Sequence, residues 1–180
     1  MSRIALITPD IATIEQQALL QAPEKSSGRV PNLLRILANS PAALRAFLGL
    51  QGLAREGSLD HPTRERIAIA LAQKNGSTYC LSAHAQLGSQ AGLNGAEMES
   101  NRQGDSHDAK AAVAVRFACR LIERRGDLDD EALRAMRDAG YSDAEIVEVI
   151  AHAGLNFLSN LLSKVSQVEL DFPLVSLNRG

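Results

Sequence analysis

Tryptophan is absent from this sequence, and aromatic residues make up only 3% of its 180 residues. Alanine and leucine are frequent instead, and both residue types form helices readily. The composition therefore favours close-packed helices over sheets. The length is sufficient for one domain with a core of its own, so we predict a single all-α domain over residues 1–180.

The sequence also lacks an excess of charge of either sign, because its formal net charge is −2 and no basic stripe is visible. This balance gives no electrostatic reason to expect nucleic acid or an anionic membrane as a partner. The first nine residues contain only the apolar run Ile4–Ile7, which is too short for a signal peptide or a membrane span. The two cysteines, Cys80 and Cys119, form no secreted disulfide framework. We therefore predict a cytoplasmic protein.

Internal repeats, glycine-rich phosphate loops and a Ser-His-Asp hydrolase signature are missing as well. Cys80, His84 and His152 offer possible metal ligands, but no second Cys or His pair completes a zinc-type set, so metal binding is the weaker interpretation. We expect no cofactor and no bound metal. A bridge between Cys80 and Cys119 is left open, although a buried core thiol is favoured for Cys119.

The most informative stretch runs from Glu65 to Gly92. An apolar helical run ends at an Asn-Gly turn, and a second helix then carries Ser77, Cys80 and His84 at spacings that place all three on one face. A neighbouring imidazole and the positive end of a helix both favour the reactive thiolate form of cysteine. If the two helices pack antiparallel, Glu65 meets His84 rather than Cys80 and orients the imidazole.

The same residues allow an ordinary structural interpretation. A single cysteine in an alanine-rich helix is often a small buried hydrophobe, and a single histidine is often a hydrogen-bonded structural residue. Motifs this short also arise by chance. Spacing alone therefore leaves both interpretations open.

The pattern Glu65-x11-Ser77-x2-Cys80-x3-His84 resembles the signature of the carboxymuconolactone decarboxylase superfamily, especially its alkylhydroperoxidase (AhpD-like) and peroxidase-related branch. In that branch the pattern is E-x11-C-x2-C-x3-H, so a serine replaces the first motif cysteine at position 77. The resemblance implies an AhpD-like domain of about six to eight helices that forms a homo-oligomer, as a dimer, trimer or hexamer. It also implies that Cys80 is the second motif cysteine and that His84 and Glu65 relay protons.

Three functions are compatible with this resemblance. The first is a thiol-dependent alkylhydroperoxidase-like antioxidant enzyme in which Cys80 reduces a peroxide and Ser77 donates a hydrogen bond. An external thiol or dithiol must then act as reductant, because Ser77 cannot form a Cys-x-x-Cys disulfide. The second is cofactor-free acid/base chemistry on a small organic acid or lactone, in which His84 and Glu65 act and Cys80 only lines the pocket. The third is a non-catalytic oligomer that binds a small molecule.

Turn and capping signals predict the helices that surround this motif. The first is predicted from about residue 10 to residue 20 and is followed by a polar loop over residues 23–28. Ser40 and Pro41 open a helix to about Arg55, and residues 59–62 open the helix of Glu65, with His61 expected as a solvated residue just outside it. Residues 101–108 are predicted to be a surface loop, followed by helices over residues 108–125 and 129–138.

The longest predicted helix opens with a capping box at residues 142–145 and extends to about residue 168. Its apolar stripe consists of Ile146, Val149, Ile150, Ala153, Phe157, Leu161 and Val165. A polar stripe beside it consists of His152, Asn156, Asn160 and Ser163. The resemblance favours burial of this polar stripe, so we predict that Tyr79, His152, Asn156 and Asn160 line a pocket or an oligomer interface.

Overall fold

The computed structural model describes residues 1–178, and this part of the chain is all-helical, as predicted from its composition. It contains nine helices, where the sequence predicted six to eight. Their bounds are α1 (Ile14–Ser27), α2 (Asn32–Leu37), α3 (Pro41–Glu56), α4 (His61–Lys74), α5 (Thr78–Gln90), α6 (Gly95–Arg102), α7 (Ala109–Glu123), α8 (Asp130–Asp138) and α9 (Asp143–Ser166).

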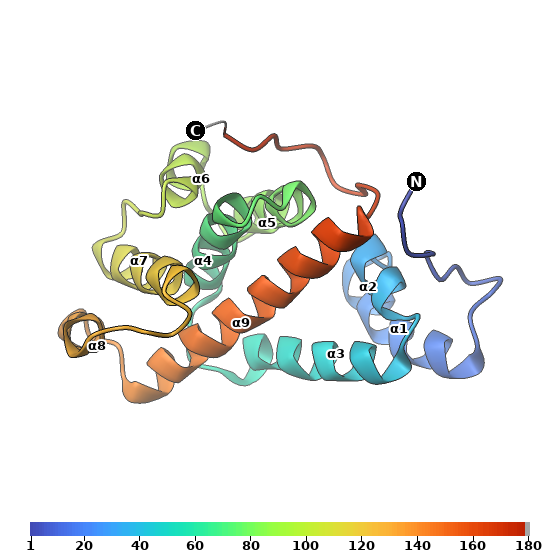
Figure 1. Ribbon diagram of the computed structural model, residues 1–180, viewed down its shortest axis with the longest axis horizontal. Coiled ribbons are helices and arrows are strands. Elements are labelled where there is room, and N and C mark those ends of the chain that lie inside the picture. Colours follow the sequence, from blue (N-terminus) through green and yellow to red (C-terminus); the bar gives the residue numbers. More distant parts are fainter. Residues whose placement is uncertain (179–180) are drawn as a thin grey trace.

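Helix α4 lies at the centre of the molecule, with α5, α6, α7 and α9 packed around it (Figure 1). Its apolar residues divide between two clusters of the core. Ile69 and Ala72 join the cluster that includes α2, α3 and α5, whereas Ile67, Ala70 and Leu71 join the cluster built on α7, α8 and α9. Burial on every side explains why residues 67–72 of α4 form an unbroken apolar run.

Helix starts follow the capping residues that the sequence predicted. Ser40, Asp60 and Ser77 each accept a hydrogen bond from the backbone N–H three residues later, and Pro41 and Pro62 lie in the first turns of α3 and α4. The turn between α4 and α5 uses Gly76 at φ +67°, a left-handed conformation that glycine adopts without strain. This tight turn makes α4 and α5 antiparallel neighbours.

The prediction for the N-terminal region was wrong in two respects. Helix α1 begins at Ile14 rather than near residue 10, because Thr13 and Gln16 form a reciprocal capping box. It also continues through Pro23, where a polar loop was predicted, and ends at Gly28, which adopts the left-handed conformation at φ +72°.

The prediction for α9 was right for the polar stripe and wrong for the apolar one. His152, Asn156, Asn160 and Ser163 are all buried. Four of the predicted stripe residues are exposed instead, at 38–65% of their surface: Ile150, Phe157, Leu161 and Val165. The polar face points inward because it finds hydrogen-bond partners there, such as the side chains of α5 and of the turn before it. By length and composition alone, α9 is the one described helix that could cross a membrane, but half of that segment is buried in the protein.

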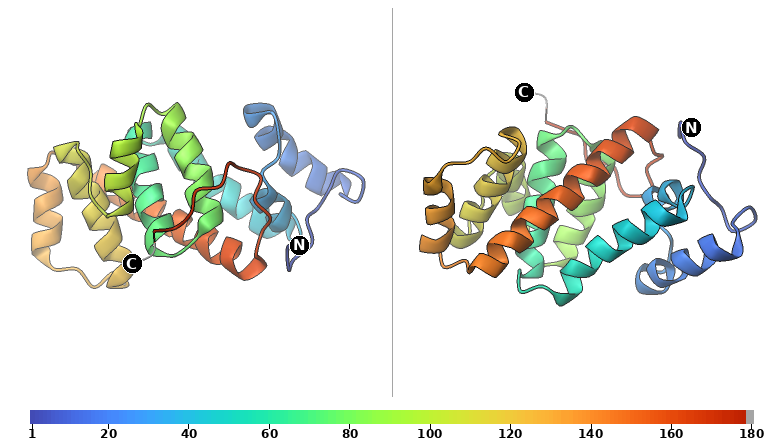
Figure 2. Two further views of the ribbon diagram at one scale, coloured as in Figure 1. Left: turned by 90° about the horizontal axis from the view of Figure 1, so that it is seen from above. Right: turned by 60° about the horizontal axis from the view of Figure 1, so that its bottom comes forward.

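After α9 the chain continues as an extended segment that lies over α5 (Figure 2). The backbone N–H of Val175 donates to Ser82 of α5, and Arg102 of α6 donates to the carbonyl of Ser176. These contacts hold the C-terminal segment against the helices that form the pocket described below.

Candidate functional site

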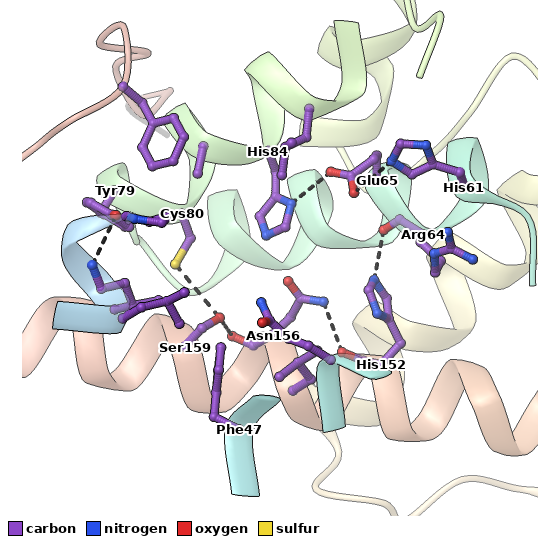
Figure 3. A pocket seen from close by; sticks show the side chains of 18 residues that line it. Phe47, His61, Arg64, Glu65, Tyr79, Cys80, His84, His152, Asn156 and Ser159 are labelled. Carbon is purple, nitrogen blue, oxygen red and sulfur yellow. Dashed lines mark hydrogen bonds and ion pairs between the residues drawn. The ribbon is translucent and has the colours of Figure 1, made fainter. Parts of the chain in front are cut away.

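A cavity of about 350 Å³ lies between α4, α5 and α9 and is bordered by α2, α3 and the C-terminal segment. Figure 3 shows the side chains that line it. Its apolar lining includes Leu33, Leu34, Phe47, Ala83, Leu155 and Phe172. Its polar lining includes Cys80, His84, Glu65, His61, His152, Asn156 and Ser159. The volume and the mostly apolar walls fit a small organic molecule.

His84 and Glu65 form the closest polar pair in the cavity, as the antiparallel packing of α4 and α5 predicted. The Nδ1 atom of His84 lies 2.8 Å from the Oε2 atom of Glu65. This contact fixes the imidazole and leaves its Nε2 atom as the nitrogen that a bound molecule can reach. Burial acts to raise the pKa of Glu65, but the charge and hydrogen bond of His84 outweigh it and hold the pKa below its ordinary value.

Two further imidazoles surround the same carboxylate. His61 is the first residue of α4 rather than a residue outside the helix, and its Nε2 atom lies 3.5 Å from Glu65. His152 of α9 lies 3.0 Å, measured from its Nε2 atom, from the backbone carbonyl of Arg64. A carbonyl only accepts, so Nε2 carries the proton and Nδ1 is left as an acceptor. Burial lowers the pKa of His152 to about 4, so this ring is neutral at physiological pH.

Cys80 lies one turn before His84 on α5, and its sulfur contacts hydroxyl groups of α9. The Sγ atom is 3.8 Å from the Oγ atom of Ser159 and 3.7 Å from that of Ser163. Both serines donate their own protons to backbone carbonyls of α9, so the thiol is the donor in these contacts. The imidazole of His84 has Glu65 as its partner, as predicted, and activation of the thiol by this imidazole stays a prediction.

Ser77 is buried behind Cys80 and is not part of the cavity wall. Its hydroxyl accepts from the backbone N–H of Cys80 at 3.3 Å and lies 2.7 Å from the hydroxyl of Ser163. Because Ser163 gives its proton to the carbonyl of Asn160, Ser77 donates to Ser163. Ser77 thus begins α5 and links it to α9.

The remaining predicted residues divide between pocket and core. Tyr79 and Asn156 line the cavity, and the hydroxyl of Tyr79 accepts from the backbone N–H of Leu33. Burial is the main reason that the pKa of Tyr79 lies well above its ordinary value. Asn160 is buried but does not line the cavity, and its side chain accepts instead from Asn75 in the α4–α5 turn.

Sequence analysis missed two contributors to this site. Ser159 lies three residues after Asn156 on the polar stripe of α9, so helical periodicity alone was enough to include it. Phe172 comes from the extended C-terminal segment and packs edge-to-face on Tyr79, with ring centroids 5.6 Å apart. No sequence signal linked Phe172 to this pocket.

Cys80 and Cys119 are both free thiols, so the bridge between them that the sequence left open is not formed. Cys119 is only partly buried, and burial raises its pKa to about 11. Among the described residues, no group of three or more His, Cys, Asp or Glu side chains is arranged to hold a metal ion.

Residues 41–118 match the model of the carboxymuconolactone decarboxylase family. This segment contains α4 and α5 with Glu65, Ser77, Cys80 and His84. Over these residues the chain is similar to the carboxymuconolactone decarboxylase family. No curated protein matches the chain.

Solved structures show that the fold is AhpD-like. An uncharacterized peroxidase-related protein with an alkylhydroperoxidase AhpD core, from Ralstonia eutropha JMP134, superposes with a TM-score of 0.85 at 19% identity, covering 94% of this chain and 92% of that one. An uncharacterized peroxidase-related protein from Silicibacter sp. TM1040 gives a TM-score of 0.82 at 22% identity, covering 93% and 91%. The debrominase Bmp8, solved in complex with 2,3,4-tribromopyrrole, gives 0.73 at 16% identity, covering 93% and 91%. At sequence identities this low, the similarity shows a shared fold and no more.

Proposed function

We propose that this chain is a member of the carboxymuconolactone decarboxylase superfamily and reduces small organic hydroperoxides with a single catalytic thiol. The observation that carries the proposal is one cavity that is lined by Cys80 and, one turn further along α5, by His84 with its partner Glu65. The sulfur and the imidazole have separate hydrogen-bond partners and both face the cavity, so one bound substrate can contact both (Figure 3).

The chemical step needs a nucleophile and a proton donor on opposite sides of the O–O bond. Cys80 first gives up its proton, which the imidazole of His84 receives through the bound molecule or water. The thiolate then attacks one peroxide oxygen, so that an S–O bond forms while the O–O bond breaks. The leaving alkoxide takes the bonding electron pair and receives the proton from His84. The products are an alcohol and a sulfenic acid on Cys80.

Glu65 makes this proton transfer easier because it stabilises the protonated imidazole and keeps its Nε2 atom aimed at the substrate. Ser159 and Ser163 border the sulfur, and rotation of their hydroxyls away from the backbone carbonyls supplies donors to the thiolate. An external thiol then attacks the sulfenic acid and releases water. A second thiol equivalent reduces the mixed disulfide and restores Cys80.

The test measures loss of cumene hydroperoxide in the presence of dithiothreitol. Cys80→Ala should reduce turnover to the uncatalysed background, because the attacking sulfur is gone. Cys119→Ser is the matched control, since it removes the other thiol outside the cavity, and it should retain wild-type turnover. Unchanged turnover in Cys80→Ala would contradict the proposal.

A second candidate function is cofactor-free acid/base chemistry on a small organic acid or lactone. It is favoured by the His84–Glu65 pair, which is complete without the thiol of Cys80, because the sulfur contacts serine hydroxyls of α9 instead. In this case His84 moves the proton, Glu65 stabilises its charged form, and Cys80 only shapes the cavity.

Alkylation of Cys80 separates the two candidates when it is combined with a His84→Gln variant. Thiol-dependent reduction should be lost on both treatments. Acid/base turnover of a small lactone should be lost only in His84→Gln if a small alkylating group on Cys80 leaves room for the substrate. If both treatments abolish peroxide turnover, and the untreated protein does not turn over a lactone, only the first candidate function remains.

A further inference from the structure

Two buried side chains on α9 present hydrogen-bond acceptors to the cavity. His152 is 7% exposed and Asn156 is 2% exposed, and both line the cavity one helical turn apart. Figure 3 shows Asn156 between Ser159 and His152 along α9. The reaction proposed above uses neither His152 nor Asn156, so their arrangement bears on what else the cavity recognises in a bound molecule.

The hydrogen bonds of both side chains are directed by backbone carbonyls, which only accept. The Nε2 atom of His152 donates to the carbonyl of Arg64 at 3.0 Å, so its Nδ1 atom is an acceptor. The Nδ2 atom of Asn156 donates to the carbonyl of His152 at 2.9 Å, so its Oδ1 atom is the remaining acceptor. The backbone therefore fixes which atom of each side chain is free to accept.

Neither acceptor has a hydrogen-bond partner in the described part of the chain. Three other polar side-chain atoms of the described residues are both fully enclosed and unpartnered, and the acceptors of His152 and Asn156 are not among them. Both acceptors are therefore accessible from the cavity that they line. Because a buried acceptor without a donor costs free energy, a ligand that supplies an O–H or N–H group is favoured over one that does not.

The charges around these acceptors favour a neutral donor. Glu65 acts to raise the pKa of His152 and Arg64 acts to lower it, so both charges lie close to the imidazole. The two charges oppose each other, and the site therefore attracts neither an anion nor a cation by net charge. A carboxylate would also face two acceptors, which offer it no hydrogen bond.

The acceptors are separated from the sulfur along α9. The thiol of Cys80 contacts Ser159, which lies seven residues after His152, or roughly 10 Å along the helix. Leu155 lines the cavity between these two levels. A molecule that reaches both Cys80 and His152 therefore needs an apolar body, of the size of one aromatic ring, between its reacting group and its donor.

We propose that the substrate is a small apolar molecule with a neutral O–H or N–H group that donates to Nδ1 of His152 or Oδ1 of Asn156 while the reacting group lies at Cys80. The inference rests on the proposed function for the reacting group only, because recognition of the donor needs no chemical step. Phenols, alcohols and amides carry such a group. His152 and Asn156 thus select the substrate, and His84 moves the proton.

Binding of two matched probes to the full chain, followed by NMR titration, tests the proposal. The first probe is para-cresol, which has the donor, and the second is its methyl ether, which lacks it. The wild type should bind para-cresol about 10-fold more tightly, as expected for one hydrogen bond to a buried acceptor. Bound para-cresol should also slow the alkylation of Cys80 and not that of Cys119, which lies outside the cavity.

Substitution of each acceptor locates the donor. His152→Phe and Asn156→Leu remove the acceptors and keep the approximate size of the side chains. With both changes present, the preference for para-cresol over its methyl ether should fall to about 2-fold or less. Phe47→Leu is the matched control, because it alters only the apolar wall and should weaken the binding of both probes by the same factor. Circular dichroism checks that the variants are folded.

A preference for para-cresol that survives the loss of both acceptors overturns the proposal. A wild type that binds the two probes equally, or binds neither at about 10 mM, overturns it as well. So does tighter binding of para-toluate that is lost in Arg64→Gln, because the cavity would then select an anion.

The inference and the proposed function fail separately, because binding of the probes is measured without turnover. A wild type that prefers para-cresol but reduces no hydroperoxide would support the donor site and contradict the proposed function. A wild type that reduces cumene hydroperoxide but shows no preference between the probes would contradict the donor site alone.

Discussion

Glu65 and Glu97 are both buried carboxylates near the centre of the molecule, but they have different partners. Glu97 of α6 is 5% exposed and receives hydrogen bonds from the side chains of Arg66, Asn101 and Ser106 and from the backbone N–H of His107. Glu65 of α4 is 7% exposed, and its charged partners are imidazoles, above all that of His84. Only Glu65 faces the cavity.

The contrast separates a carboxylate that supports the fold from one that is suited to proton transfer. Burial acts to raise the pKa of Glu97, but its hydrogen bonds, led by that from Ser106, outweigh burial and lower the pKa to about 2. An arginine partner keeps its proton at all accessible pH values, so the Glu97 pair is fixed. An imidazole partner gains and loses a proton near neutral pH, so the Glu65 pair can change its charge during a reaction.

The largest expected effect is on stability, through Glu97. Glu97→Ala should lower the free energy of unfolding by about 3–5 kcal/mol, because it leaves the guanidinium of Arg66 and the α6–α7 connection without their acceptor. Urea unfolding followed by circular dichroism measures the change. Glu65→Gln, which keeps the size of the side chain, should lower the free energy of unfolding by a clearly smaller amount. Equal losses would remove the distinction between the two carboxylates.

The next effect is a pH dependence on the Glu65 side. His152 has a pKa of about 4 in the folded protein and an ordinary value of 6.5, so the unfolded chain binds more protons between these values. Stability should therefore fall as pH decreases, by about 2–3 kcal/mol between pH 7 and pH 4.5. His152→Gln should flatten this part of the profile. Glu97 remains charged throughout the window, so a profile that Glu97→Gln flattens instead would contradict the assignment.

Turnover should show the opposite pattern from stability. Glu65→Gln should lower kcat/KM for cumene hydroperoxide by about 100-fold, as expected for loss of a group that supports proton transfer. Glu97→Gln, assayed at a temperature at which it is folded, should stay within about 3-fold of the wild type. A larger loss in Glu97→Gln than in Glu65→Gln would reverse the comparison.

The smallest expected effect concerns His61. Its imidazole is about half exposed and lies 3.5 Å from Glu65, so solvent screens much of their interaction. His61→Asn should therefore change kcat/KM by no more than about 3-fold, whereas His84→Asn should approach the loss seen in Glu65→Gln. Steady-state kinetics of the two variants side by side provide the measurement.

Local signals predicted the parts of the molecule that local chemistry determines. The caps at Ser40, Asp60 and Ser77 and the Asn-Gly turn place α4 against α5, and this arrangement was sufficient to predict that Glu65 meets His84. The single-domain assignment, the cytoplasmic location and the catalytic roles of the site residues stay predictions.

Interactions between distant segments determine what the sequence could not predict. The apolar stripe of α9 was expected to face the core, but Ser163 and Asn160 bond to Ser77 and Asn75, more than 80 residues earlier, and turn the polar face inward. Asn94 caps α6 by accepting from the backbone N–H of Glu97, but the Glu97 carboxylate is occupied by Arg66 and by the connection to α7, far along the chain. Residues 101–108 were expected to form a loop, yet Asn101 is fully buried in α6 beside Glu97.

The most direct test of the proposed chemistry is to trap the oxidised thiol. Wild type and Glu65→Gln are treated with one equivalent of cumene hydroperoxide, and a dimedone-type reagent captures sulfenic acid for mass spectrometry at successive times. We predict an adduct on Cys80 and not on Cys119, forming about 100-fold more slowly in Glu65→Gln. No adduct on Cys80, or equal rates in the two proteins, would contradict a thiol whose reaction depends on the His84–Glu65 pair.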